Sequence, residues 1–300
     1  MNILITGANG QLGKDCQTVF GGSHTMTCVD IEELDITRAD DVLTFVRDIQ
    51  PGVIINCAAF TQVDRCETEQ DLARAVNVSG AENLARGAAE CGALMVHIST
   101  DYVFDGEKNF PETYDETDDT GPQSVYGRTK LEGEQAVMSC TDNHLVLRTA
   151  WLYGFNGHNF IKAILKKTLS DPEEPVKVVN DQFGTPTWSM ALACQIEELL
   201  APPARGLYHA SAEGACTWYA FARYFLEKLR VPHRLIPCTT AEYPTPAKRP
   251  RCAILENHRL KVENRNRMEH WQSALDNYIN QYGPALLDEC RPTSQATEKT

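Results

Sequence analysis

The sequence predicts an α/β protein built on a doubly wound parallel sheet. Short apolar runs alternate with helix-forming stretches over the first half of the chain, and this alternation is typical of parallel strands joined by right-handed helical crossovers. The first apolar run leads into a glycine-rich turn and then a helix, as in the Rossmann dinucleotide-binding fold. The alternation of strands and helices becomes less regular in the second half of the chain, where we expect a smaller α/β substrate-binding domain.

Composition limits the class of protein. The chain has 300 residues, 42% of them hydrophobic, and a formal net charge of -13, so nucleic acid and anionic membrane surfaces are poor partners. The 11 cysteines are scattered, with no Cys-x-x-Cys pair, which favours reduced thiols over metal ligands. No segment resembles a targeting leader or is apolar enough to span a bilayer. We therefore expect a soluble cytoplasmic protein.

We divide the chain into two domains and a tail. Residues 1–150 are expected to form the dinucleotide-binding domain, which also takes in part of 176–200. Residues 151–290 are mainly the substrate-binding domain. Residues 291–300 are polar and are expected to be disordered.

A possible pyrophosphate site lies near the start of the chain. The apolar residues 2–6 predict a buried strand, and a helix is expected over 14–20. Gly7, Gly10 and Gly13 lie between them. Glycines permit a tight turn and a close backbone approach, and the helix N-terminus offers free N–H groups. The spacing is Gly-x-x-Gly-x-x-Gly, so an ordinary strand-to-helix turn is the alternative.

Asp30 is the candidate for cofactor choice, because it follows the second expected strand, 25–29. An acidic residue about 20 positions beyond the glycines commonly binds ribose hydroxyls and disfavours a 2′-phosphate. This favours NADH, although Lys14 or Arg38 could offset the preference. Asp30 could instead cap a helix or a turn.

The remaining elements continue the alternation. They are helix 40–49, strand 53–56, helix 69–91, strand 94–99, a helix near Tyr126, strand 145–149, helix 159–169, strand 176–179, helix 190–200, strand 206–210, helix 217–229 and helix 270–282. Ligands bind at the C-terminal ends of strands in such sheets. The small residues Ala58 and Ala59 would let a cofactor lie against the backbone, and Thr100 would stand where a substrate hydrogen bond is needed.

Tyr126 and Lys130 are the strongest candidates for catalysis. Residues four apart on a helix share a face, so an ammonium beside the phenol would lower the phenol pKa from about 10. Such a phenol can exchange a proton with a substrate oxygen. A surface tyrosine and a solvated lysine are the alternative.

The most basic stretch is 248–251, at the end of the Pro-rich segment 241–250. Arginine binds phosphate oxygens through bidentate hydrogen bonds. Arg249 is therefore a candidate to hold a diphosphate, and a solvated loop is the alternative.

The most specific motifs resemble the dTDP-4-dehydrorhamnose reductase family, within the extended short-chain dehydrogenase/reductase superfamily. The glycine turn, Thr100 and the pair Tyr126 and Lys130 are shared across the superfamily. The segments that resemble the family itself are 99–106, 126–130, 148–151, 180–187 and 243–250. The resemblance covers residues 1–280.

The resemblance implies NADPH- or NADH-dependent reduction of the 4-keto group of a dTDP-linked 6-deoxyhexulose. The product would be dTDP-L-rhamnose, a precursor of cell-surface polysaccharide. Tyr126 would be the proton donor, Thr100 a second catalytic contact, and Lys130 the residue that binds the nicotinamide ribose and tunes the phenol. The implied cofactor-binding residues are Gly7, Gly10, Gln11, Leu12, Gly13, Asp30, Asp35, Ile36, Ala58, Ala59, Phe60, Tyr126 and Lys130. The implied substrate-binding residues are Thr100, Asp101, Trp151 and Arg249.

Two features of the family do not carry over directly. Position 60 is Phe where relatives often carry His. Some members are dimers bridged by a magnesium ion on carboxylates, so a homodimer and magnesium are open for this chain. No metal ligand can be mapped onto the sequence.

Two other functions stay open. One is a nucleotide-sugar epimerase or 4,6-dehydratase, but a dehydratase would carry Asp and then Glu after the threonine. Here Asp101 is followed by Tyr102. The other is a catalytically silent subunit resembling the regulatory subunit of methionine adenosyltransferase, which the intact Thr100, Tyr126 and Lys130 disfavour.

Overall fold

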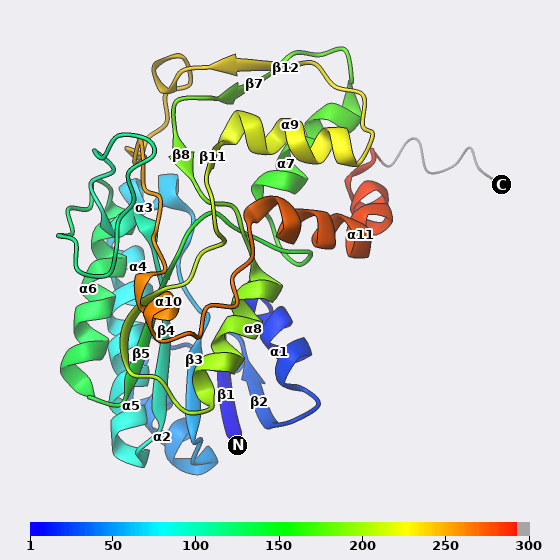
Figure 1. Ribbon diagram of the computed structural model, residues 1–300. Helices are drawn as coiled ribbons and strands as arrows, with labels where there is room; N and C mark the ends of the chain where they lie inside the picture. Colours follow the sequence, from blue (N-terminus) through cyan, green and yellow to red (C-terminus); the bar gives the residue numbers. More distant parts are fainter. Residues whose placement is uncertain (293–300) are drawn as a thin grey trace.

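Six parallel strands form the large sheet in the lower part of Figure 1, in the order β10-β5-β4-β3-β1-β2. Their bounds are β1 Asn2–Thr6, β2 Thr25–Val29, β3 Val53–Asn56, β4 Leu94–Thr100, β5 His144–Thr149 and β10 Gly206–His209. This computed structural model describes residues 1–292. The predicted parallel sheet is confirmed, whereas the tail expected to be disordered over 291–300 lies almost entirely outside the described residues.

Helices cover both faces of this sheet. They are α1 Gln11–Phe20 and α8 Ser189–Leu200 on one face, and α2 Ala39–Ile49, α5 Ala81–Cys91 and α6 Val125–Cys140 on the other. Successive strand residues point to opposite faces. Ile3 and Ile5 accordingly pack with α1 and α8, while Leu4 packs with α2 and α5. A parallel sheet needs this double cover, because both of its faces are apolar.

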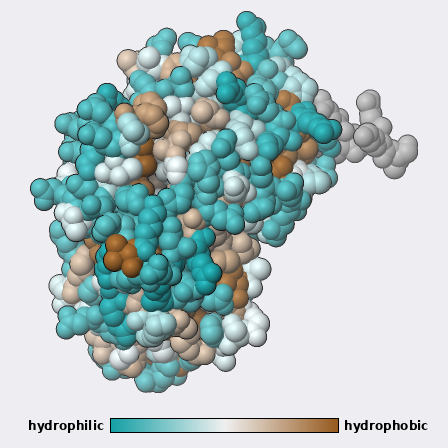
Figure 2. Space-filling model, in the orientation of Figure 1, coloured by the Kyte–Doolittle hydropathy of each residue, from teal (hydrophilic) through white to brown (hydrophobic). Residues whose placement is uncertain are grey.

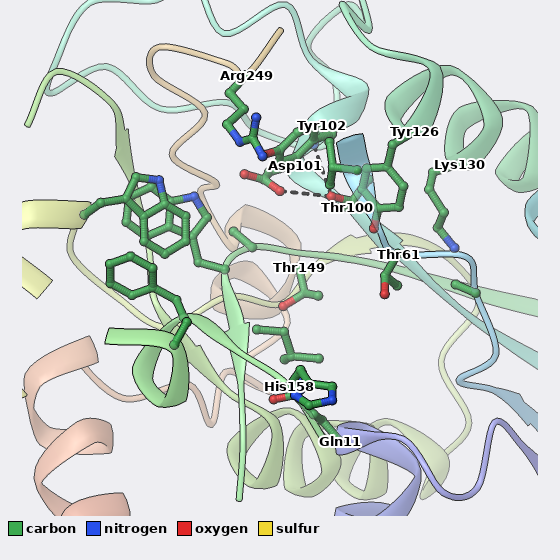
Figure 3. A pocket seen from close by; sticks show the side chains of 18 of the residues that line it. Gln11, Thr61, Thr100, Asp101, Tyr102, Tyr126, Lys130, Thr149, His158 and Arg249 are labelled. Carbon is green, nitrogen blue, oxygen red and sulfur yellow. Dashed lines mark hydrogen bonds between the residues drawn. The ribbon is translucent and has the colours of Figure 1, made fainter. Parts of the chain in front are cut away.

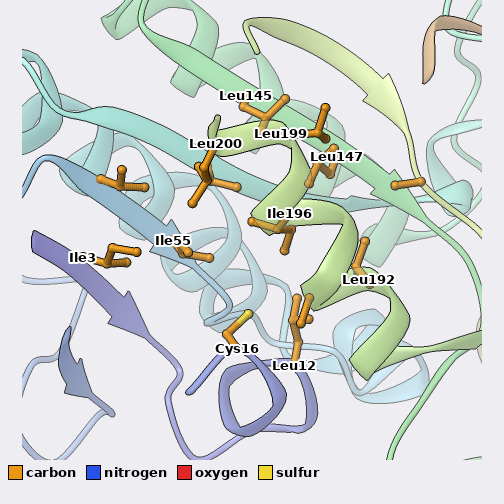
Figure 4. Packing of buried hydrophobic residues seen from close by; sticks show 14 of the residues in the cluster. Ile3, Leu12, Cys16, Ile55, Leu145, Leu147, Leu192, Ile196, Leu199 and Leu200 are labelled. Carbon is orange, nitrogen blue, oxygen red and sulfur yellow. The ribbon is translucent and has the colours of Figure 1, made fainter. Parts of the chain in front are cut away.

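Helix α8 reaches the sheet from the second half of the chain. Ile196 and Leu199 have no exposed surface and point toward strand residues such as Leu147 (Figure 4). Burial of each such side chain contributes about 1.5–3 kcal/mol. The sheet layer therefore takes in residues from 189–209 in addition to the range 1–150.

The connection between β3 and β4 differs from the single helix expected over 69–91. It consists of α3 Val63–Thr68, α4 Gln70–Arg74, a π-helical segment Ala75–Gly80 and α5. Asn77, in the π turn, accepts a hydrogen bond from the Phe60 backbone (2.8 Å) and donates one to Thr129 (3.1 Å). These tertiary bonds stabilise the wider turn, and π turns are frequent near functional sites.

The second half of the chain forms a smaller layer above the C-terminal ends of the sheet strands (Figure 1). Its helices are α7 Phe160–Ser170, α9 Trp218–Lys228 and α11 Trp271–Cys290. The short helix α10 His258–Val262 instead packs against β10, where Leu260 joins the core of the sheet layer. Its strand pairs are β6 Leu152–Tyr153 with β9 Thr187–Trp188, β7 Val176–Val179 with β12 Leu235–Cys238, and β8 Phe183–Gly184 with β11 Cys216–Thr217. Short 3-10 turns lie at Asp101–Val103 and Thr240–Glu242.

Most predicted helices of this layer agree with the structure within a residue or two, but α11 does not end at 282. It continues through Pro284 to Cys290, because Leu286 and Cys290 are buried in the apolar cluster of this layer. The face shown in Figure 2 is largely hydrophilic, with apolar residues in small separate patches. No helix in the described part of the chain is both long and apolar enough to cross a membrane.

Candidate active site

A cavity of about 700 Å³ lies where the sheet layer meets the smaller layer. It is lined by the glycine turn after β1, by the segments after β3 and β4, by the start of α6, and by residues of the second half of the chain. Strands β2 and β3 lie on opposite sides of β1, so the chain reverses direction along the sheet at this point. Open α/β sheets bind ligands at such a switch point.

The glycine turn forms a backbone cradle at the cavity. Gly7 has φ +65°, and a Cβ there would lie 2.6 Å from the Ala58 nitrogen. A Cβ at Gly13 would lie 2.8 Å from the Ala8 Cα. Helix α1 has Gly10 at its N-cap, without a side-chain cap and without an acidic residue in its first turn. Its first N–H groups are therefore available to an anion.

Two observations test whether a nicotinamide dinucleotide fits this cavity. The uncapped N-terminus of α1 suits a pyrophosphate, with Gly10, Gln11, Leu12 and Gly13 all lining the cavity. Across the cavity, the Thr149 hydroxyl is buried and has no hydrogen-bond partner among the described residues. Both features call for a polar ligand, so the residues present fit the cofactor.

Asp30 lies at the edge of the glycine turn. Its Oδ2 accepts a hydrogen bond from the Asn9 N–H (2.8 Å), and its own N–H donates to Glu33 (2.9 Å). Arg38, which could have offset its charge, is paired with Asp41 at 2.8 Å. The carboxylates of Asp30 and Glu33 therefore flank the expected ribose position. Arg38, the arginine of this segment, is already engaged by Asp41.

Besides Gly7 and Asp30, three further residues assigned to the cofactor by resemblance lie outside the lining of the central cavity. The Asp35 carboxylate accepts hydrogen bonds from the N–H (3.0 Å) and hydroxyl (2.7 Å) of Thr37. Ile36 is buried in the core between the sheet and its outer helices. The Phe60 ring packs beneath the Arg65 guanidinium, 5.2 Å from the ring centroid. Their contacts with a cofactor stay predictions.

Thr100, Tyr126 and Lys130 all line the cavity, as the sequence predicts. Thr100 ends β4, and α6 begins just before Tyr126 because the Ser124 side chain caps the helix by accepting from the Gly127 N–H (3.1 Å). Figure 3 shows the Thr100 and Tyr126 side chains converging on the same space. This arrangement can surround a substrate oxygen with hydroxyl donors.

The prediction that Lys130 lowers the pKa of the Tyr126 phenol is wrong. Lys130 Nζ donates to the Ile98 carbonyl (2.6 Å), lies 3.5 Å from His97 Nε2, and makes no hydrogen bond to Tyr126. Burial raises the pKa of the Tyr126 phenol above its usual value, although the Thr100 hydroxyl opposes the shift. Burial also lowers the pKa of Lys130 to about 8. Desolvation is therefore the largest cause of the pKa shift at both groups.

Asp101 is the buried acid of the site. Its carboxylate accepts a hydrogen bond from the Thr100 hydroxyl (3.0 Å), and burial raises its pKa to about 7. The Tyr102 ring meets the Tyr126 ring edge-on, with centroids 5.4 Å apart. Position 102, where a dehydratase would carry a second acid, thus holds an aromatic wall of the cavity.

The opposite wall is aromatic. Trp151 stacks on Trp218 with ring centroids 3.5 Å apart and planes 7° apart, and Phe160 lies against Trp218 at 4.5 Å. Trp151 has a left-handed backbone, φ +44°, and its ring also lies over Gly184, where a Cβ would be 2.5 Å from its Nε1. Nothing in the sequence marks Trp218 and Phe160 as residues of the site, since aromatic residues at helix starts form no local motif.

Arg249 reaches the cavity but is not a free cation. Its Nη1 and Nη2 donate to the two oxygens of Asp64, at 3.0 and 2.9 Å. This bond holds the pKa of Asp64 below its usual value. Lys167 and Lys177, which the sequence analysis did not single out, also line the cavity and are exposed. The anionic part of a substrate would therefore meet a paired arginine and two lysines.

Magnesium was left open by the sequence. Among residues 1–292, no group of three or more His, Cys, Asp or Glu side chains is arranged to hold a metal ion.

Comparison with known proteins places this geometry in one family. Residues 1–283 match the family model described as the RmlD substrate binding domain. The dTDP-4-dehydrorhamnose reductase of Escherichia coli is 36% identical over 296 residues, which cover 94% of this chain and 98% of that protein. The enzyme of the same name from Streptomyces griseus is 40% identical and covers 91% of each chain.

Solved structures agree with these relatives. A dTDP-4-dehydrorhamnose reductase from Clostridium acetobutylicum superposes with a TM-score of 0.90 at 42% identity, covering 94% of this chain and 100% of that one. The Bacillus anthracis reductase, solved in complex with NADP, has a TM-score of 0.90 at 37% identity over 93% and 99% of the chains. A Thermus thermophilus UDP-glucose 4-epimerase in complex with NAD, at 18% identity and a TM-score of 0.82, shares the fold. The chain belongs to the dTDP-4-dehydrorhamnose reductase family.

Proposed function

We propose that the protein reduces the 4-keto group of dTDP-4-dehydro-L-rhamnose with NADPH or NADH, giving dTDP-L-rhamnose for cell-surface polysaccharide synthesis. One observation is the main support for this proposal. Thr100, Tyr126 and Lys130 line the same cavity as the uncapped N-terminus of α1. A set of hydroxyl donors beside a pyrophosphate cradle suits carbonyl reduction by a dinucleotide.

The cofactor would be held mainly by backbone. Gln11 and Leu12 would offer N–H groups to the pyrophosphate, while the Gly10 N–H holds the turn by donating to the Gly7 carbonyl (3.1 Å). The small residues Ala58 and Ala59 would let the dinucleotide lie against the chain. When bound, the nicotinamide supplies the hydride. Lys130 would bind the nicotinamide ribose through the part of its amino group that faces the cavity.

Tyr126 would give its phenolic proton to the substrate oxygen. Negative charge develops on that oxygen during reduction, and positioned donors that meet such charge are usually the largest contribution to catalysis. Thr100 would offer a second hydroxyl by turning its proton from the Asp101 carboxylate, to which it donates in this structure (3.0 Å), toward the substrate oxygen. Since burial raises the pKa of Tyr126, the phenol keeps its proton at neutral pH, as a donor in the reductive direction must.

The sugar nucleotide would occupy the opposite wall. Asp101 would contact the sugar near the reacting carbon, and Trp151 would contact the pyranose ring with the part of its side chain that lines the cavity. Arg249 would meet the diphosphate with the N–H groups that Asp64 leaves free. The attraction of Arg249 for the diphosphate would be weaker than that of an unpaired arginine, because the Asp64 carboxylate offsets its charge.

The cellular setting is also part of the proposal. All 11 cysteines are free thiols in the structure, which suits a cytoplasmic enzyme. The family resemblance is the basis for proposing a homodimer. Light scattering of the protein in solution would measure its oligomeric state.

The test is oxidation of NADPH or NADH in the presence of dTDP-4-dehydro-L-rhamnose, followed at the nicotinamide absorbance. Turnover with formation of dTDP-L-rhamnose is the expected result. An epimerase or dehydratase would convert its nucleotide sugar without net consumption of added cofactor. A catalytically silent subunit would do neither, and either outcome would reject the proposal.

A further inference from the structure

A chain of buried polar groups runs beneath the catalytic lysine. It links Thr6 on β1, Asn56 on β3, His97 on β4 and Lys130 on α6. All four side chains are at least 98% buried. Asn56 and Lys130 line the cavity whereas His97 does not, so His97 can act on a ligand only through its neighbours.

The orientation of the Asn56 amide is fixed by its partners. The Ala58 backbone N–H, which can only donate, lies 3.0 Å from Oδ1, and the Thr6 hydroxyl donates to the same oxygen at 2.9 Å. The Nδ2 group must therefore be the one that faces His97 Nδ1, at 3.2 Å. An amide nitrogen is a donor only, so His97 Nδ1 accepts.

This bond fixes the tautomer of His97. A neutral imidazole has one donor nitrogen and one acceptor nitrogen, so the His97 proton lies on Nε2. Full burial and the Lys130 charge lower the pKa of His97 well below its usual value, which keeps the ring neutral. The Nε2–H thus faces Lys130 Nζ at 3.5 Å.

A donor facing an amino group favours one charge state of that group. An ammonium has three donors and no lone pair, whereas the neutral amine can accept the His97 N–H while still donating to the Ile98 carbonyl. The other titratable groups near the amine are Cys57 and Glu134, whose charges raise its pKa, and Tyr126 on the same helix. Glu134 is itself engaged by Arg148 (2.7 Å).

We propose that His97 is a positioning residue that holds Lys130 Nζ below the cavity and, by presenting an N–H to it, favours the neutral amine. The inference rests on the proposed function only for its effect on turnover. Lys130 would then exchange its proton within the working pH range, so that its charge toward the nicotinamide ribose depends on pH. Asn56, which pairs with His97 on the neighbouring strand, sets this behaviour by fixing the tautomer.

The first test reads the tautomer in the ligand-free protein. Nitrogen-15 NMR of histidine-labelled protein, with the His97 signals assigned by their loss in His97→Asn, should show protonation at Nε2 from pH 6 to 9. Protonation at Nδ1, or a doubly protonated ring at neutral pH, would overturn the proposal. This measurement needs neither substrate nor a functional variant.

The second test reads the charge of Lys130. Carbon-13 NMR of labelled lysine, with the signal assigned by Lys130→Met, follows its titration. In His97→Gln an amide oxygen can accept from the ammonium, so the midpoint should rise by about one pH unit, a tenfold gain in proton affinity. In His97→Asn, which keeps an acceptor for Asn56, the rise should be smaller.

The control is His258→Gln, an exposed histidine at the start of α10, which should leave the midpoint unchanged. A midpoint unaffected by His97→Gln would mean that burial alone sets the lysine, and the proposal would fail. The alkaline loss of NADH affinity, measured by fluorescence, should move upward together with the NMR midpoint. If the protein shows the predicted tautomer and titration but does not reduce the dTDP-sugar, the proposed function fails and this inference stands.

Discussion

The two walls of the cavity are built in different ways. The sheet-side wall consists of backbone N–H groups at the start of α1 and of side chains fixed at strand and helix ends, such as Thr100 and Tyr126. The opposite wall consists of side chains that hold one another, Trp151 on Trp218 and Arg249 on Asp64. The first wall is therefore set by the fold, and the second by individual contacts.

This difference has a functional consequence. Backbone at a switch point can be kept while side chains around it change, so the affinity for the nicotinamide cofactor should respond little to most single substitutions. The opposite wall should respond strongly, and mainly in the binding of the sugar nucleotide. Each substitution below is chosen to affect one wall, which makes the separation of the two walls measurable.

The largest effect is expected at the sheet-side wall. Tyr126→Phe removes the proposed proton donor and should lower kcat by about 10²–10⁴-fold, the range for loss of a general acid. NADH affinity, measured by fluorescence, should be nearly unchanged because the phenol is not part of the backbone cradle. Tyr102→Phe is the matched control, since its ring borders Tyr126, and it should keep most of the activity. Near-normal turnover of Tyr126→Phe would remove the tyrosine from the mechanism.

The next effect is expected at the opposite wall. Arg249→Ala should raise KM for the dTDP-sugar by roughly 10–150-fold, because a charge-assisted hydrogen bond is lost (about 1.5–3 kcal/mol). It also leaves the Asp64 carboxylate facing the substrate phosphates. The nicotinamide KM should barely move, and an effect on it instead would contradict the division into two walls.

Two further variants test whether Arg249 binds the substrate phosphates. Arg251→Ala is the matched control, since this exposed arginine bonds to Asn109 (2.9 Å) and does not line the cavity. Asp64→Asn removes the offsetting charge but keeps hydrogen-bond acceptors for the guanidinium. A lower sugar KM in Asp64→Asn would mean that Arg249 binds phosphate, while a higher one would mean that the pair mainly holds the loop.

The same contrast explains what the sequence could predict. The glycine turn and the pair Tyr126 and Lys130 are local patterns, and the fold brings them together at the end of a sheet whose strands are recognisable from their apolar runs. Asp64 and Arg249 are 185 positions apart, and no local spacing connects them. Such side-chain partners depend on the path of loops that only the structure gives.

Burial is the other limit on sequence reasoning. Spacing correctly put Tyr126 and Lys130 on one helix, but it gave no measure of desolvation, and desolvation reversed the expected direction of the phenol pKa. His97 sits within an apolar strand and looks like a core residue. Its role depends on which atoms of Asn56 and Lys130 face it, which the sequence does not contain.

A stability change is expected at the aromatic wall. Gly184→Ala would place a methyl group 2.5 Å from Trp151 Nε1, and the Trp151 ring cannot retreat because its other face rests on Trp218. Such overpacking should lower the free energy of unfolding by about 1–3 kcal/mol, measured by urea denaturation. The sugar KM should rise while the nicotinamide KM is kept. Gly22→Ala is the control, because nothing lies within 4 Å of the added carbon.

The smallest effect is expected on the preference between NADPH and NADH, which we expect to depend on the Asp30 side chain. The Asp30 carboxylate is held by the Asn9 N–H at 2.8 Å, so it would face the ribose hydroxyls in a fixed orientation. Use of both cofactors is expected, with a modest preference. Asp30→Ala should shift the ratio of kcat/KM values toward NADPH by about fivefold, since an exposed charge interaction is worth up to about 1 kcal/mol.

Glu33 makes this last prediction specific. Its carboxylate accepts from the Asp30 N–H (2.9 Å) and places a second negative charge in the same segment. Glu33→Gln keeps an acceptor for that N–H while removing the charge, so it should shift the ratio in the same direction but by less than Asp30→Ala. If both variants leave the ratio unchanged, neither carboxylate lies near the ribose. If Glu33→Gln shifts the ratio more than Asp30→Ala, the 2′-position of the ribose lies closer to Glu33, and the specificity of this wall comes from the loop after β2 rather than from the end of the strand.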